Sequence, residues 1–299
     1  MNDTTSGQNP EKDVAVLLNN ELHGIKIPTR PAVLSSIEAQ MRSRSPNLGA
    51  LEKVISLDVS ISGSLLKIAN SAFFGHAGQV RSVKKALQIL GLNTVGTAIA
   101  ALSLRKAFAH VPNLERFWDS SAQIAQLSGW LATRVDTKLS KLRPEEAYTF
   151  GLFRDCGIPI LMSFYSTYFD VLKLANNEAA RPFTEVERDD IGVDHGAIGA
   201  MLAKEWQLPL EYQAAIELHH DVTAIREQNS PAVPELARHF MAIAQLAEYL
   251  FQRLTGLNRT CEWGKLGEAC LGVLGLDEEG MNQLLQMAEE QGLCKAPGI

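Results

Sequence analysis

The sequence predicts an all-α fold, a multi-helical bundle of roughly a dozen helices joined by short turns. Strict alternation of polar and apolar residues is nearly absent, whereas apolar residues recur at spacings of three and four. The clearest stripe is formed by Leu236, Phe240, Ile243, Ala247, Leu250 and Leu254. It predicts one long helix with a single buried face.

Prolines, glycines and apolar stripes mark further helices. Their expected places are residues 33–41, residues 48–57, a stripe of Ile61, Leu65 and Ile68 that ends at Asn70, and a segment that opens at Pro144. Proline in the first turn of a helix costs no hydrogen bond, and the acidic residues after Pro144 favour the positive helix end. Gly91 is expected to separate two apolar segments, and a polar, proline-bearing loop is expected over residues 228–234.

Composition and charge argue against several classes of protein. The 299 residues are 46% hydrophobic and 21% charged, which is ordinary globular usage. No apolar run long enough to cross a bilayer is evident, and residues 1–11 lack the pattern of a secretory signal, so we expect a cytoplasmic protein without a membrane partner. The net charge of −6 argues against a nucleic-acid partner. The basic cluster of Arg81, Lys84 and Lys85 is interpreted as a solvated helix face.

Four cysteines and three tryptophans are expected in the core. They are Cys156, Cys261, Cys270 and Cys294, with Trp118, Trp130 and Trp206. The cysteines have no CxxC spacing and lie among apolar residues, which is typical of buried free thiols. The tryptophans fall among apolar or small residues at helical spacing, which is more typical of core anchors than of a platform for stacking bases.

An ordered set of motifs runs from Lys26 to Phe108. It comprises Ile27-Pro28, Pro31-Ala32-Val33, Asp58, the run Leu65-Leu66-Lys67-Ile68-Ala69-Asn70-Ser71-Ala72, Phe74-Gly75 and Leu90-Gly91. In this order the motifs resemble the first half of an HDOD domain, and their joint agreement is more specific than any single motif. The resemblance implies an N-terminal helical subdomain in a bacterial signalling protein.

The second half resembles the HD-domain part of that family, whose active relatives are metal-dependent phosphohydrolases. In those enzymes, histidine and aspartate side chains hold one or two metal ions that activate a water molecule. Three of the implied ligand positions are altered in this chain, where Ser120, Arg154 and Gln245 replace His, His and Asp. Potential ligands remain at Asp155, His195, His219 and His220.

These departures predict that the chain has no catalytic residues and no cofactor. Arg154 places a permanent cation where a divalent metal would sit. We expect Arg154 or another basic side chain to pair with Asp155, and one weakly held divalent metal on Asp155, His195 and His219 is the alternative. Because a helix turns about 100° per residue, at most one of His219 and His220 is expected to point inward.

Asn70 and Ser71 form a candidate recognition site, because both side chains can bind a ligand. The local interpretation is favoured instead. Asn tolerates the left-handed conformation that ends a helix, and Ser can bond to turn backbone or cap the next segment.

The resemblance also implies an organisation along the chain. Residues 1–24 are a polar segment with a short helix, residues 25–255 are the HDOD domain, and residues 256–299 are C-terminal helices packed on the core. The domain divides into a helical part at residues 25–112 and a degenerate HD-like part at residues 113–255. Residues 1–10 are expected to be disordered.

The predicted function is that of a non-catalytic regulatory module in signal transduction. We expect a helical groove at the disabled metal site to bind a signalling protein partner, or a small-molecule effector. The alternative is a residual metal-dependent phosphohydrolase acting on a nucleotide or phosphodiester. The sequence predicts no particular oligomeric state.

Overall fold

The computed structural model describes residues 24–70, 78–135, 142–227 and 233–294, and it contains helices and no strand within these ranges. The N-terminal end comprises α2 (Ala32–Met41), α3 (Leu48–Ile55), α4 (Val59–Ala69) and α5 (Val83–Ala107). Next come α6 (Glu115–Ala132), α7 (Pro144–Phe153), α8 (Gly157–Phe164), α9 (Tyr168–Asn177), α10 (Phe183–Ile191), α11 (His195–Glu205) and α12 (Leu210–Leu218). The chain continues with α13 (Val222–Arg226), α14 (Glu235–Thr255), α15 (Glu262–Leu274) and α16 (Glu278–Glu290). The predicted all-α class is confirmed.

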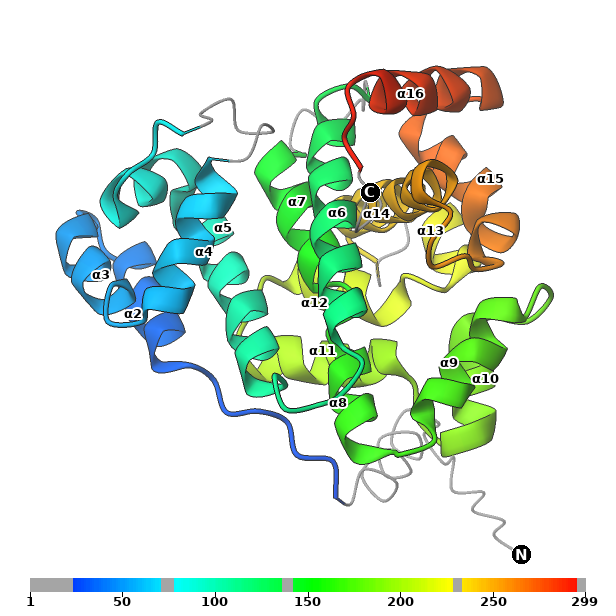
Figure 1. The fold of residues 1–299 in the computed structure, drawn as a ribbon, viewed down its shortest axis with the longest axis horizontal. Helices are drawn as coiled ribbons and strands as arrows, with labels where there is room; N and C mark the ends of the chain where they lie inside the picture. The colour runs from blue at the N-terminus through cyan, green and yellow to red at the C-terminus, as the bar shows by residue number, and fades with distance from the viewer. Residues whose placement is uncertain (1–23, 71–77, 136–141, 228–232, 295–299) are drawn as a thin grey trace, which may run out of the picture.

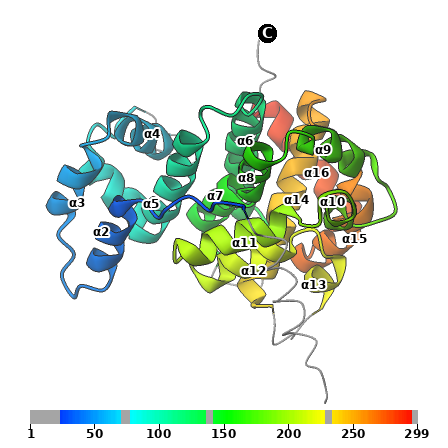
Figure 2. The same ribbon diagram turned by 90° about the horizontal axis from the view of Figure 1, so that it is seen from below.

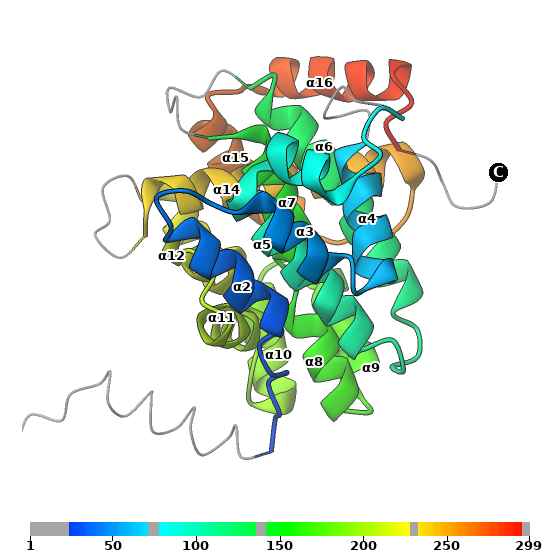
Figure 3. The ribbon, with the colours of Figure 1, turned by 90° about the vertical axis from the view of Figure 1, so that its left-hand side faces the viewer.

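The helices are arranged along one long direction of the molecule. Helices α2, α3 and α4 gather at one end, and α9, α10, α15 and α16 lie at the other, with α5, α6 and α7 between them (Figures 1 and 2). Figure 3 looks onto the N-terminal end, with α2, α3 and α4 in front. Helices α9, α10, α15 and α16 therefore lie far from α2, α3 and α4.

One cluster of buried apolar residues runs through the whole molecule, from Leu34 in α2 to Ala288 in α16. The C-terminal helices α15 and α16 contribute to it, as Leu274 and Met281 show. Because this core crosses the expected boundaries near residues 112 and 255, the division of the chain into those parts stays a prediction. Three segments lie outside the described residues: residues 1–23, residues 71–77 with Ser71, and residues 228–232 of the expected loop.

The predicted helices are found close to their expected bounds. The stripe from Leu236 to Leu254 lies on α14, and the segment that opens at Pro144 is α7. The three tryptophans are all buried, and Trp206 is only 1% exposed. The four cysteines are free, but only Cys156 and Cys270 are fully buried, so the expectation for the other two is only partly met.

Gly91 breaks α5, as the sequence predicts, because its dihedrals (φ 75°, ψ 161°) are not helical and suit glycine. Helix α5 is nevertheless long and apolar enough to cross a membrane by length and composition, so the expectation that no such segment exists is wrong. In its most apolar window 56% of the residues are buried inside the fold. Together with the break at Gly91, this burial is typical of a core helix.

The side chain of Asn70 joins the end of α4 to the start of the next segment. Its amide nitrogen donates to the carbonyl oxygens of Leu66 (2.9 Å) and Val80 (2.7 Å), and its oxygen accepts from the Val80 amide (2.9 Å). The expected left-handed conformation is wrong, because Asn70 has φ −94° and ψ 2°. These three bonds give Asn70 a structural role, and a recognition role for Asn70 and Ser71 stays a prediction.

The Asn70→Ala variant should lower the free energy of unfolding by about 1–3 kcal/mol, because it leaves the polar groups of buried Val80 without partners. Urea unfolding followed by circular dichroism measures the change. Asn177→Ala is the matched control, since the exposed Asn177 side chain bonds, among the described residues, only to the Lys173 carbonyl of its own helix. Equal losses in both variants would contradict the bridging role of Asn70.

Candidate metal centre

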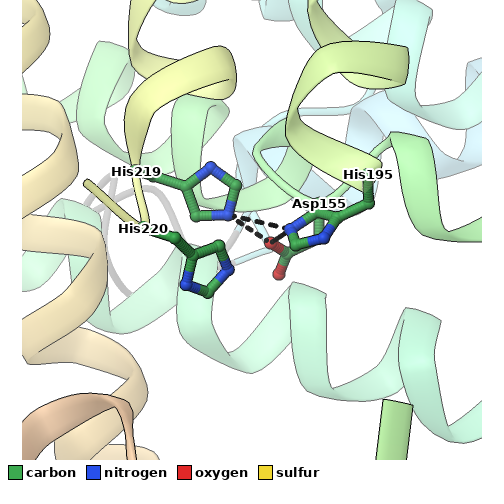
Figure 4. A group of neighbouring side chains, drawn as sticks. All are labelled: Asp155, His195, His219 and His220. Carbon is green, nitrogen blue, oxygen red and sulfur yellow. Dashed lines mark hydrogen bonds and ion pairs between the residues drawn. The ribbon is translucent and has the colours of Figure 1, made fainter. Parts of the chain in front are cut away.

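Four potential metal ligands meet where helices of the second half end or begin. Asp155 lies in the turn between α7 and α8, His195 opens α11, and His219 and His220 follow the last residue of α12. One ligand atom from each residue lies within 4.8 Å of the others (Figure 4). The structure therefore brings together the four residues at which the sequence keeps potential ligands.

The backbones of these helices approach so closely that only glycine fits at the contact points. A Cβ atom on Gly157, the first residue of α8, would lie 2.0 Å from the carbonyl oxygen of His195. A Cβ atom on Gly196 in α11 would lie 2.8 Å from the carbonyl oxygen of Glu217 in α12. Real side chains do not tolerate contacts this short, so glycine at both positions sets how near α8, α11 and α12 come to one another.

His195 is oriented by a buried carboxylate. Both oxygens of Glu187 on α10 lie within 2.9 Å of the His195 Nδ1 atom, and Glu187 also accepts the backbone N–H of His195 at 3.1 Å. Tyr168 on α9 donates its hydroxyl hydrogen to the same carboxylate. A carboxylate here accepts the Nδ1 hydrogen, which leaves the lone pair of the neutral ring on Nε2.

His219 is oriented in the same way by a backbone group. Its Nδ1 atom donates to the carbonyl oxygen of Ile216 at 2.7 Å, so the lone pair of the neutral ring again lies on Nε2. This Nε2 atom lies 3.2 Å from the His195 Nε2 atom and 3.2 Å from an Asp155 oxygen. Three electron-rich atoms thus converge at one point, and a positive charge between them is required to offset their repulsion.

The charges around the cluster favour such a positive charge. Burial alone would lower the pKa of His195, but the carboxylates of Glu187 and Asp155 outweigh it and raise the pKa to about 9. Burial would raise the pKa of the Asp155 carboxyl, yet the charge of Arg154 holds it well below its usual range. With its pKa raised in this way, the His195 imidazole carries a proton near neutral pH, and this positive charge faces the Asp155 carboxylate.

His220 also points into the cluster. Its Nδ1 atom lies 2.6 Å from a carboxylate oxygen of Glu262 on α15, and its ring stacks on Phe183 with centroids 4.7 Å apart. Burial holds the pKa of His220 well below its usual value, so the ring is neutral. The prediction that at most one of the two neighbouring histidines points inward is wrong. Both rings reach the cluster from the C-terminal end of α12, whose last residue is Leu218.

Arg154 is buried beside the cluster, with 4% of its side chain exposed, and it makes two ion pairs. Its Nε atom donates to Asp155 at 3.1 Å, and its Nη2 atom donates to Glu248 on α14 at 2.7 Å. The pairing of Arg154 with Asp155 is the one expected from the sequence. The second partner, Glu248, was not anticipated, and it gives the guanidinium a fixed position.

The two other altered positions differ from each other. The Ser120 hydroxyl donates to the Arg116 carbonyl oxygen at 2.8 Å and accepts from the Asn258 side chain at 2.6 Å, so it is fully engaged. Gln245 is 1% exposed and its side-chain oxygen has no hydrogen-bond partner among the described residues. It lies one turn before Glu248 on α14. Neither side chain belongs to the group of potential ligands.

Sequence reasoning missed the residues that hold the histidines and Arg154 in place. They are Tyr168, Glu187, Glu248 and Glu262. Glu187 lies eight residues before His195, in an acidic stretch whose members look alike in sequence. Only its complete burial distinguishes it, and burial depends on how α9 and α10 pack.

The donor set fits one divalent metal ion. The Nε2 atoms of His195 and His219 lie next to an oxygen of Asp155. The Nδ1 atom of His195 donates to Glu187, and that of His219 donates to the Ile216 carbonyl oxygen. Metal-bound histidines are usually oriented by such a second hydrogen bond. Nitrogen and oxygen donors of this kind suit transition metals such as Zn²⁺ or Mn²⁺. The residues that would hold the ion are Asp155, His195 and His219, with His220 beside them.

Comparisons with known proteins agree with this architecture. The family model of the HDOD domain matches residues 27–222. An uncharacterized protein from Treponema pallidum is 24% identical over 220 residues, which are 73% of this chain and 42% of that protein. The chain thus spans less than half the length of this relative.

Two solved structures share the fold. The "Putative signal transduction protein" from Marinobacter aquaeolei has a TM-score of 0.66 at 21% identity, over 94% of this chain and 64% of that chain. The "Putative metal-dependent phosphohydrolase" from Shewanella amazonensis has a TM-score of 0.59 at 15% identity, over 93% and 99% of the two chains. At these identities the likeness shows a common helical architecture.

Proposed function

The chain belongs to the HDOD family, and from this premise we propose that it is a non-catalytic regulatory module of signal transduction that binds a protein partner. In this proposal the candidate metal centre stabilises the fold and does not turn over a substrate. The name of the structurally similar Marinobacter protein agrees with a signalling role. A cytoplasmic location and a bacterial source stay predictions from the sequence.

The position of Arg154 carries the proposal. A hydrolase with two metal ions needs donors on both sides of the shared carboxylate, and here one side of Asp155 is paired with a guanidinium at 3.1 Å. Arginine remains charged at every accessible pH, and Glu248 holds it in place at 2.7 Å. A second cation at this position would meet a fixed positive charge.

One ion on the remaining donors would join three elements. Asp155, His195 and His219 come from the α7–α8 turn, from α11 and from the end of α12, so a shared ion would tie these elements together. A bound divalent ion can also polarise a phosphoryl oxygen or a water molecule. The centre is buried, however, with His195 completely inaccessible and 19% of the Asp155 side chain exposed.

This burial bears on where a partner would bind. A helical groove at the disabled metal site was expected from the sequence, but the imidazoles that line the centre are enclosed by Phe183 and the surrounding helices. The burial therefore favours a partner surface elsewhere on the molecule.

Hydrolysis assays on the purified 299-residue chain test the proposal. With Mn²⁺, Mg²⁺ or Zn²⁺ added, we expect no cleavage of bis(p-nitrophenyl) phosphate, nucleotides or cyclic dinucleotides above the rate of the Asp155→Ala variant. Metal-dependent turnover that the Asp155→Ala substitution abolishes would contradict the proposal.

The second candidate function is a residual phosphohydrolase that uses one ion. It is supported by three potential metal ligands that lie close together, with the Nε2 atoms of both histidines available to bind an ion. The name of the similar Shewanella protein agrees with it. The same assay distinguishes the two, since this candidate requires turnover that depends on Asp155, His195 and His219.

A further inference from the structure

A pocket lies at the N-terminal end of the molecule, among the helices that face the viewer in Figure 3. Its volume is ≈ 500 Å³, within the range of sites that take up a ligand or a few partner side chains. Its walls come from the start of α2, from α3, from the turn between α3 and α4, and from α4 and α5. The lining residues are Pro31, Val33, Val54, Ile55, Leu57, Asp58, Ile61, Ser103, Lys106 and Ala107. It is separate from the candidate metal centre, none of whose residues line it.

Large apolar side chains stand exposed at this pocket. Leu57, in the turn between α3 and α4, is 86% exposed, and Val54 is 37% exposed. Val59, at the start of α4 beside pocket-lining Asp58, is 83% exposed. Single exposed apolar residues are ordinary, but three of them within six positions beside an apolar pocket are typical of a surface that another chain covers.

The charge of this part of the chain has the opposite sign to that of the whole protein. Between residues 24 and 112 the sequence has eleven Lys and Arg but only three Asp and Glu, although the full chain is acidic. The three carboxylates already have partners: Glu38 pairs with Arg30 and Arg42, Glu52 accepts from the Lys84 amide, and Asp58 pairs with Lys106.

Two cations next to the pocket are free to meet a partner. Lys53 precedes pocket-lining Val54, and Arg105 precedes pocket-lining Lys106. Both are exposed, and neither has a carboxylate partner in the part of the chain that the structure describes. Free cations beside an apolar pocket complement a ligand that is apolar in the middle and acidic at its flanks.

One polar atom inside the pocket also lacks a partner. The Ser103 hydroxyl oxygen is inaccessible to solvent and has no hydrogen-bond partner among the described residues. Leaving such a buried polar atom unpaired costs stability.

We propose that this pocket docks an acidic segment of a protein partner, which inserts one or two large apolar side chains and directs its carboxylates to Lys53 and Arg105. The inference rests on the proposed function and names the surface and the partner chemistry for it. A nucleic acid fits the same surface less well, because the walls are mainly apolar and the one basic lining residue, Lys106, is already paired with Asp58 at 2.6 Å.

Peptide binding to the full-length chain tests the proposal. The probe is a fluorescent 16-residue amphipathic peptide of Leu, Ala and Glu with Leu at helical spacing, and it is compared with the same peptide carrying Lys for Glu, the same peptide carrying Ser for Leu, and a short DNA duplex. Fluorescence anisotropy should show that only the first probe binds, with an affinity that weakens as salt increases.

Two variants with the same substitution locate the binding surface. Leu57→Glu should weaken binding of the acidic peptide at least about tenfold, whereas Leu210→Glu, at a 73% exposed leucine on α12 outside the pocket, should leave it unchanged. Both leucines are exposed, so both variants should fold, which circular dichroism checks. Absence of acidic-peptide binding, equal binding of the acidic and basic peptides, binding that does not depend on Leu57, or binding of DNA alone would each overturn the inference. None of these results touches the hydrolysis assay, so failure here is distinguishable from failure of the proposed function.

Discussion

The Arg154→Ala variant is expected to lose about 3–5 kcal/mol of unfolding free energy. The substitution removes the cation that two carboxylates share, and it leaves Asp155 and Glu248 without their partner in a poorly solvated environment. An uncompensated buried charge is among the most destabilising changes known for a single residue. Urea unfolding monitored by circular dichroism at neutral pH measures the loss.

The matched control is Arg226→Ala, which also removes an arginine from an ion pair. Arg226 lies 2.6 Å from Glu268, but both side chains are more than half exposed, so we expect a loss of at most about 1 kcal/mol. If Arg154→Ala lost no more unfolding free energy than Arg226→Ala, the guanidinium of Arg154 would not be held firmly between Asp155 and Glu248.

The Gly157→Ala variant is expected to lower the free energy of unfolding by at least about 3 kcal/mol. The added methyl group would lie 2.0 Å from the carbonyl oxygen of His195, and this backbone atom cannot move aside as a flexible side chain could. Helices α8 and α11 would have to separate, which would also displace His195 from Asp155 and His219. Thermal and urea unfolding measure the loss of stability.

Gly63→Ala provides the control for the same substitution in a helix. Apart from the backbone of α4 itself and the two neighbouring residues, no atom of the described residues lies within 4 Å of the position that a Cβ would take on Gly63. Alanine favours a helix over glycine by up to about 1 kcal/mol. The control should therefore be neutral or slightly stabilising. A Gly157→Ala protein as stable as the wild type would mean that α8 and α11 do not approach as closely as the structure has them.

Apolar spacing was sufficient to predict most of the fold. The stripe from Leu236 to Leu254 predicted α14, and Gly91 was correctly identified as a break, because both depend on local rules of helix geometry. The family resemblance supplied Asp155, His195, His219 and His220 as candidate ligands, and these residues do converge. The ion pair between Arg154 and Asp155 followed from the need to satisfy a buried carboxylate.

The parts that failed depend on tertiary contacts. His219 and His220 both reach the cluster from the end of α12, and a helix end without a glycine or proline to mark it is hard to place from sequence. Asn70 bonds to Val80, ten residues away, instead of adopting a left-handed conformation. Glu187 and Glu262 are partners of histidines that lie 8 and 42 residues away, and no periodic pattern records such pairings.

The number of metal ions that the chain can bind tests the central claim most directly. The wild-type protein should be equilibrated with excess Mn²⁺ or Zn²⁺, freed of unbound metal and analysed by elemental mass spectrometry. With Arg154 fixed between Asp155 and Glu248, we predict no more than one ion per chain, and we predict that any bound ion is lost in the His219→Ala variant. Two ions per chain, or an ion that persists without His219, would contradict the account.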